Sequence, residues 1–208
     1  YGKNGEISNG SFCGNDFDSL MPMAHKYIVD SIKRWTSFYG VDGFRFDLMG
    51  IIDVDTMNEA FAEAQKIEPS MIIYGEGWNM PSLIDDELKA AQFNNKKMPN
   101  IGYFNDRFRD NIKGSTQDVE EKGFATGSFL DIKVTMDVIA GTSLPVSYGY
   151  CYLNPNQVVN YVECHDNHTV WDKMLKSNED ESELVRKERQ KLMIAMILLS
   201  QGIPFLHA

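Results

Sequence analysis

The chain has 208 residues, 43% of them hydrophobic, and a formal net charge of −10 at pH 7. This length and composition allow a globular core and exclude a fully disordered chain. The acidic balance disfavours nucleic acid and anionic membranes as partners, because both repel negative charge. The sequence has no apolar run long enough to span a bilayer and no signal-peptide pattern at its start, and it leaves the location open between cytoplasmic and secreted.

The cysteines are odd in number and widely spaced, at Cys13, Cys151 and Cys164. This pattern predicts reduced thiols rather than a disulfide framework or a paired-cysteine zinc site.

The first half of the chain alternates between helical and extended patterns. A helix is predicted over residues 23–38, where apolar residues that include Tyr27, Trp35 and Phe38 recur at helical spacing. A strand is predicted over 44–47, and a second helix starts at the capping-box pattern of Thr56 and Glu59. A second strand follows over 71–74. Helix, strand, helix and strand with short links predict a parallel sheet covered by helices.

The second half is less regular. Residues 81–150 show weak periodicity, with a short strand predicted at 101–106 and a helical turn at 108–112. The apolar run at 158–162 predicts another strand. A charged stretch at 178–189 leads into the apolar run 192–199 as one helix, before a turn and strand over 201–206.

Polar side chains stand at the carboxyl ends of three predicted strands. Arg45 and Asp47 share one face of the first strand, because side chains alternate along a strand. Glu76 lies between two glycines after the second strand, where a substrate or a backbone can approach closely. The run ECHDNH at 163–168 follows the third strand. In an α/β barrel these ends share one rim, where active sites are built.

These residues also have plainer explanations. Arg45 and Asp47 could form a structural ion pair, since buried charges are usually paired. Glu76 could be an ordinary turn residue between glycines.

The groups at 163–168 suit a metal ion by their chemistry, because imidazole and carboxylate bind zinc, manganese or iron. A metal-dependent hydrolase using His165, Asp166 and His168 is therefore an alternative, but the spacing is irregular and we predict no metal site. Neighbouring His165 and Asp166 reach one pocket only if the strand ends or bulges there. Trp78, beyond Glu76, is predicted at a rim where its ring can stack on a sugar face.

The three strand ends, in this order, resemble those of the α-amylase family of glycoside hydrolases. The run GFRFD at 43–47 resembles the nucleophile motif, GEGW at 75–78 the acid/base motif, and VECHDN at 162–167 the motif of the transition-state aspartate. The runs CGND at 13–16, FDLMG at 46–50, DVDTMN at 53–58 and CHDNHTVWDK at 164–173 are similar to type I pullulanases. The resemblance covers most of the chain.

The resemblance implies an α/β fold that is part of a (β/α)8 TIM barrel, roughly strands four to eight with their covering helices. Residues 1–208 would be a fragment of a single catalytic barrel domain, without the upstream strands and other domains. We therefore expect the chain to be a piece of a longer protein.

The resemblance also implies the roles of individual residues. Asp47 would attack the anomeric carbon, and Glu76 would protonate the leaving oxygen and later activate water. Asp166 would hold sugar hydroxyls. Arg45 would fix and ionise Asp47, and His165 would bond substrate hydroxyls, with Trp78 as a further substrate contact. We expect Glu76 to start protonated, because a retaining enzyme needs an acid and a charged nucleophile about 5 Å apart.

The function implied is retaining hydrolysis of α-1,6-glucosidic branch linkages in pullulan, glycogen or starch dextrins, a pullulanase-type debranching activity. No cofactor is implied, and calcium stays open for the full-length protein. The isolated chain is expected to be inactive or weak, and its open barrel edges are expected to self-associate. The alternative is a non-catalytic α-glucan-binding or assembly fragment.

Overall fold

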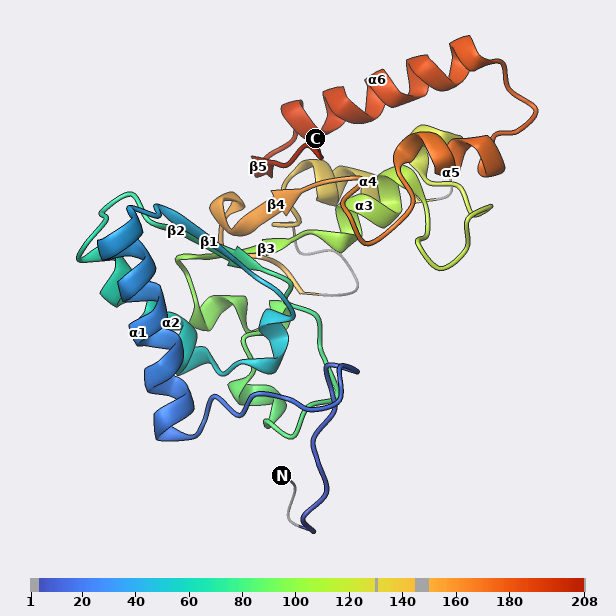
Figure 1. Cartoon of the computed structure of the whole chain (residues 1–208). Helices are drawn as coiled ribbons and strands as arrows, with labels where there is room; N and C mark the ends of the chain where they lie inside the picture. The colour runs from blue at the N-terminus through green and yellow to red at the C-terminus, as the bar shows by residue number, and fades with distance from the viewer. Residues whose placement is uncertain (1–3, 130, 145–149, 208) are drawn as a thin grey trace. The chain divides into compact units, whose positions relative to one another are not determined.

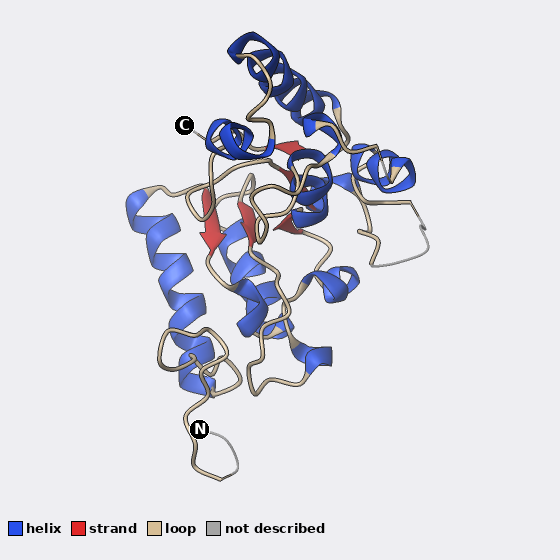
Figure 2. Ribbon diagram, turned by 90° about the vertical axis from the view of Figure 1, so that its right-hand side faces the viewer, coloured by secondary structure: helices blue, strands red, loops and turns tan. Residues whose placement is uncertain are grey.

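A computed structural model describes residues 4–129, 131–144 and 150–207. The chain divides into two compact units, unit 1 (Tyr1–Tyr103) and unit 2 (Phe104–Ala208). In both units short parallel strands are accompanied by longer helices (Figures 1 and 2). The α/β class predicted from the sequence is confirmed. The single barrel domain over residues 1–208 stays a prediction.

Unit 1 contains the predicted alternation of helices and strands. Its elements are α1 (Pro22–Tyr39), β1 (Gly43–Phe46), α2 (Val54–Gln65) and β2 (Ile72–Gly75), followed by β3 (Ile101–Phe104), which begins in this unit. Strand β1 pairs in parallel with β2, and β2 pairs in parallel with β3. Helices α1 and α2 lie side by side (Figure 1). This arrangement brings the carboxyl ends of β1 and β2 to one edge.

Helix α1 has the predicted extent, and its predicted apolar face is only partly buried. Ile32 of that face is buried and Ile28 is half-buried, whereas its aromatic residues Tyr27, Trp35 and Phe38 are exposed. The other buried residues of the helix are Val29 and Thr36. The buried face is the one that meets α2, as the hydrogen bonds of His25 to Thr56 and Glu59 of α2 show. The buried stripe of α1 is therefore shifted toward its smaller residues, and the three aromatic residues lie outside it.

Helix α2 begins one turn earlier than the sequence pattern predicts. Asp53 is its N-cap, accepting a hydrogen bond from the Thr56 backbone N–H at 2.9 Å and one from the Thr56 hydroxyl at 2.6 Å. The capping box of Thr56 and Glu59 was therefore wrong. The Asp53 carboxylate caps the backbone N–H three residues ahead, as the predicted hydroxyl would have done.

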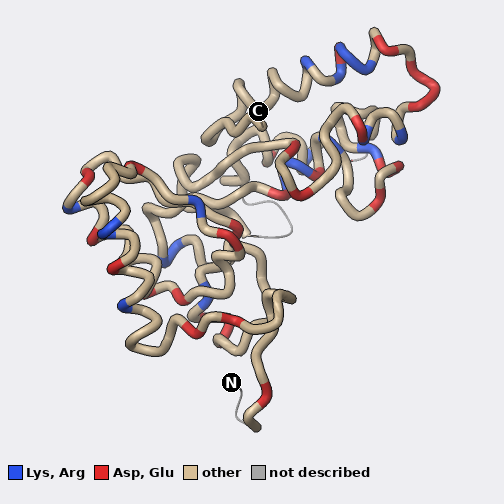
Figure 3. The backbone as a smooth tube through the Cα atoms, viewed as in Figure 1, with Lys and Arg blue, Asp and Glu red and all other residues tan. Residues whose placement is uncertain are grey.

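Unit 2 is built around a helical core. Its elements are α3 (Asp106–Lys113), α4 (Ile132–Ile139), β4 (Val158–Asn160), α5 (Val170–Ser177), α6 (Glu183–Leu199) and β5 (Ile203–Pro204), with β4 and β5 parallel. Charged residues of α6 fall in its first half, as predicted (Figure 3). None of the helices in the described part of the chain has both the length and the apolar composition to cross a membrane. The core residues are Phe108, Ile112, Ala125, Val134, Val138, Val162, Val170, Met174, Met193 and Ile197.

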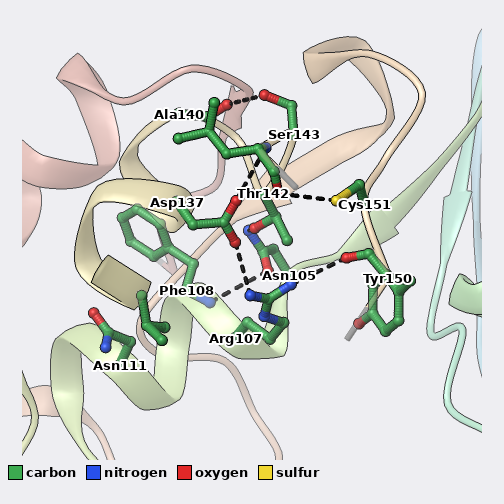
Figure 4. Close-up of polar contacts among 12 residues, drawn as sticks. Asn105, Arg107, Phe108, Asn111, Asp137, Ala140, Thr142, Ser143, Tyr150 and Cys151 are labelled. Atoms are coloured by element: carbon green, nitrogen blue, oxygen red, sulfur yellow. Dashed lines mark hydrogen bonds and ion pairs between the residues drawn. The ribbon is translucent and has the colours of Figure 1, made fainter. Parts of the chain in front are cut away.

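A buried polar cluster fastens α3 to the segment after α4 (Figure 4). The side-chain N–H of Asn105 donates to the Thr142 hydroxyl at 2.9 Å and to Asn160 at 3.1 Å. Arg107 forms an ion pair with Asp137 at 2.7 Å. Burial raises the pKa of the Asp137 carboxyl, although Arg107 opposes this effect. The cluster replaces apolar packing with a specific set of partners at this position.

Candidate active site

The register of β1 and β2 places the two predicted catalytic carboxylates on neighbouring strands. Phe46, the last residue of β1, lies opposite Gly75, the last residue of β2. Asp47 and Glu76 follow these residues directly. Because parallel strands end at the same edge of a sheet, both carboxylates leave unit 1 at one edge.

Arg45 connects the two carboxylates. Its Nη1 pairs with Asp47 Oδ1, and its Nη2 pairs with Glu76 Oε1 at 2.6 Å. The Asp47 side chain is 75% exposed, whereas that of Glu76 is 8% exposed. The guanidinium therefore holds one open and one enclosed carboxylate. The pair of Arg45 with Asp47 follows the predicted alternation, and the second arm to Glu76 is new.

A tight turn after β1 holds Glu76 from the other side. Leu48 has φ +43°, and its backbone N–H donates to Glu76 Oε2 at 3.0 Å. The backbone N–H of Gly50 donates to the Glu76 carbonyl at 3.1 Å. A Cβ on Gly50 would lie 1.9 Å from the Trp78 carbonyl oxygen, so the position requires glycine. The turn thus fixes both the side chain and the backbone of Glu76.

The glycines beside Glu76 make room for protein atoms. A Cβ on Gly75 would lie 2.7 Å from the Phe46 carbonyl oxygen, and a Cβ on Gly77 would lie 2.5 Å from the Tyr103 ring. The sequence left open whether a substrate or the protein's own backbone approaches these glycines. The atoms nearest to both glycines belong to the protein.

The environment of Glu76 acts on its proton in two directions. Burial favours the neutral acid, but the donors from Arg45 and Leu48 favour the carboxylate. Both donors point at the same carboxyl group, one at each of its oxygens.

In unit 2 the loop between β4 and α5 carries His165 and Asp166. Strand β4 ends at Asn160, so the two side chains are not forced to opposite faces. His165 Nε2 lies 3.1 Å from Asp166 Oδ1, and these side chains are 67% and 48% exposed. The condition set by the sequence, that the strand ends before this pair, is met.

The ends of that loop are tied together below the exposed pair. Glu163 Oε2 accepts a hydrogen bond from the Val170 backbone N–H at 2.5 Å. Cys164 is buried, with its Sγ 3.6 Å from Asp166 Oδ2, and burial raises the pKa of its thiol. The thiol is thus a structural neighbour of Asp166 rather than a reactive group.

Comparisons with known proteins decide the family. No family model matches the chain. The pullulanase of Bacillus subtilis is 44% identical over 204 residues, which are 98% of this chain and 28% of that protein. The crystal structure of an Anoxybacillus pullulanase with maltotetraose matches with 50% identity and a TM-score of 0.95, covering 100% of this chain and 30% of that one. The chain belongs to the pullulanase family.

The structure of the Bacillus subtilis type I pullulanase with maltose agrees, with 43% identity and a TM-score of 0.96. The five parallel strands and their helices therefore match part of known pullulanase structures, and the resemblance to type I pullulanases is confirmed. This pullulanase-family chain spans about 30% of the length of the solved structure from Anoxybacillus.

The other predicted site residues of this pullulanase homologue lie in well-anchored loops. Trp78 is partly exposed, in a segment held by the buried Lys89. Lys89 Nζ donates to the Met80 carbonyl at 2.8 Å and to Asp86 Oδ1 at 2.7 Å. Stacking of the Trp78 ring on a sugar stays a prediction. Among the described residues, no three His, Cys, Asp or Glu side chains are grouped to hold a metal ion.

Among the described residues of unit 1, hollows of different size are found. One of about 410 Å³ is lined in part by Trp35, Phe44 and Arg45, and neither Asp47 nor Glu76 is among its lining residues. Another, of about 1100 Å³, is lined by residues from 4–21, 51 and 82–85 and by none of the candidate catalytic side chains.

Proposed function

We propose that this chain supplies the nucleophile and the acid/base of a retaining glycoside hydrolase that cleaves α-1,6-glucosidic branch linkages in pullulan, glycogen or starch dextrins. One observation carries the proposal. Two carboxylates, one open and one enclosed, share Arg45 at the ends of neighbouring parallel strands in a chain of the pullulanase family.

Asp47 suits the nucleophile because it is the exposed carboxylate. Its oxygen would form a bond to the anomeric carbon as the bond from that carbon to the leaving oxygen breaks. Glu76 would deliver a proton to the leaving oxygen, then take one from the water that displaces Asp47.

Asp166 and His165 would bond sugar hydroxyls, and Trp78 would stack on a sugar ring. Their exposure supports this, since the loop between β4 and α5 presents the first two to solvent. Related structures support an α-glucan ligand. Pullulanase from Paenibacillus barengoltzii, 43% identical, is in complex with maltohexaose and α-cyclodextrin.

A second candidate is a non-catalytic α-glucan-binding or assembly fragment. The chain corresponds to 28% of the Bacillus subtilis protein. Under this candidate the residues of this chain would bind malto-oligosaccharides but supply no catalytic group, even with the rest of a pullulanase present.

A chimera separates the candidates. Residues 1–208 would replace the matching region of the Bacillus subtilis pullulanase, and reducing-sugar release from pullulan and from amylose would be measured. We expect the chimera to cut pullulan, and Glu76→Gln to lower kcat by about 10²–10⁴. Asp47→Asn should also abolish turnover, whereas Asp42→Asn, an exposed aspartate before the same strand, should not. Full turnover by Asp47→Asn would contradict the assignment, and maltotetraose binding without cleavage by the chimera would favour the second candidate.

A further inference from the structure

Two buried lysines in unit 2 each donate hydrogen bonds to the loop next to the other lysine's helix. Lys113 ends α3, and its Nζ donates to the His168 carbonyl at 3.4 Å, just before α5. Lys173 lies in α5, and its Nζ donates back to the carbonyls of Ser115, Asp118 and Val119 at 2.8, 3.0 and 3.1 Å. Each helix thus holds the segment next to the other.

Both ammonium groups are removed from water. Lys113 is 1% exposed and Lys173 is 2% exposed. Lysines are almost never fully buried unless they are paired, because the charge loses its hydration. Three hydrogen bonds to carbonyl oxygens replace part of the hydration that Lys173 loses. Lys113 has one long hydrogen bond to His168, with Glu163 and Cys164 as further electrostatic neighbours.

The Lys113 ammonium therefore stands beneath the loop of residues 163–169. Glu163, at the start of this loop, also accepts from Val170 at its end. His165 and Asp166 form the exposed tip. An anchor at His168 fixes the second half of the loop, which has no strand or helix of its own to hold it.

We propose that Lys113 is a positioning residue for the loop that carries His165 and Asp166, and that Lys173 is its reciprocal anchor on the segment after α3. The catalytic part of this inference rests on the proposed function, whereas the anchoring part does not.

Electrostatics agree with a group kept for its position. Burial lowers the pKa of Lys113 to about 8, with Arg109 adding to the effect and Asp110, Cys164 and Glu163 opposing it. Burial also lowers the pKa of Lys173, opposed by Asp118, Glu121 and Asp110. A buried charge stabilises the fold less than an apolar side chain of the same size, because it loses its hydration. The structural role of Lys113 is therefore its hydrogen bond to the loop.

The anchoring is tested on this chain by amide hydrogen exchange. The reporter is the Val170 N–H, which closes the loop on Glu163, and the reference is the Met193 N–H inside α6. In Lys113→Met we expect exchange of Val170 to speed up about tenfold or more, as for loss of a hydrogen bond from a charged group, with Met193 unchanged or slower. Lys176→Met, an exposed lysine of α5, is the matched control and should change neither amide.

Unchanged exchange at Val170, or equal acceleration at Val170 and Met193, would overturn the anchor. Should Lys113→Met fail to fold, Lys113→Gln is compared in the same way, because its shorter neutral side chain cannot reach the His168 carbonyl. The same two outcomes decide for this variant.

The positioning role is tested in the chimera with the Bacillus subtilis pullulanase. We expect Lys113→Met to lower kcat on pullulan about tenfold while KM changes less than about threefold. The bond-breaking step depends more strongly on the exact position of His165 and Asp166 than substrate binding does. Unchanged kcat with a loosened loop would overturn the catalytic role alone. A chimera that is inactive without any substitution would count against the proposed function, and the exchange result would still decide the anchor.

Discussion

Raising the pH should stabilise the chain through Lys113. Its pKa is about 8 in the folded chain, against 10.5 for an ordinary lysine. Between these values the unfolded chain keeps a proton that the folded chain has released, so the free energy of unfolding rises with pH. The fall from 10.5 to about 8 corresponds to about 3 kcal/mol, since each pH unit of displacement is worth about 1.36 kcal/mol. Roughly two-thirds of this should appear between pH 7 and pH 10.

Urea unfolding followed by tryptophan fluorescence measures this effect. The free energy of unfolding of the wild-type chain and of Lys113→Met would be determined at pH 7 and pH 10. Between pH 7 and pH 10 the free energy of unfolding of the wild type should rise by about 2 kcal/mol more than that of the variant. Subtracting the two cancels the pH dependence of all other titratable groups. The exposed Lys176→Met should follow the wild type. An equal pH dependence of wild type and Lys113→Met, or a difference of opposite sign, would refute the reasoning.

Three further results are expected. Gly50→Ala should cost about 1–3 kcal/mol through overlap with Trp78, and Gly43→Ala, whose Cβ would meet its nearest neighbour at 3.2 Å, should cost less by urea unfolding. Asp53→Ala should cost about 1 kcal/mol by removing the cap of α2, unlike Asp55→Ala. Although burial raises the pKa of Asp53, hydrogen bonds hold it below 3.8, so the cap's contribution to the free energy of unfolding should fade as pH drops below that value. Light scattering should show a dimer or larger species if open sheet edges pair, and a monodisperse monomer would contradict self-association.

Strand ends could be predicted from the sequence because their signal is local. The alternating segment before Asp47 and the apolar run before Glu76 end in polar residues or glycine, and β1 and β2 end within one residue of these points. Alternation along the strand also placed Arg45 beside Asp47. The second arm of Arg45 could not be predicted, because it depends on the register between two strands.

Contacts made by the backbone were also beyond the sequence. Nothing in the residue type of Leu48 announces φ +43°, since this conformation favours glycine and asparagine. Gly50 gave the available signal, a glycine shortly after a predicted strand. Lys113 and Lys173 escaped notice because lysine usually marks a solvated surface. Their burial follows from packing between α3, α5 and the loops beside them.

Under the proposed function, the guanidinium shared by Asp47 and Glu76 has a consequence for inhibitor choice. The formal charges of two carboxylates and one guanidinium sum to −1 for these three groups. A sugar mimic that carries one protonated amine at the anomeric position would neutralise them, and the exposed Asp47 is open to receive it. A phosphorylated or sulfated sugar of the same shape would add to the negative charge. Charge should therefore rank such ligands before shape does.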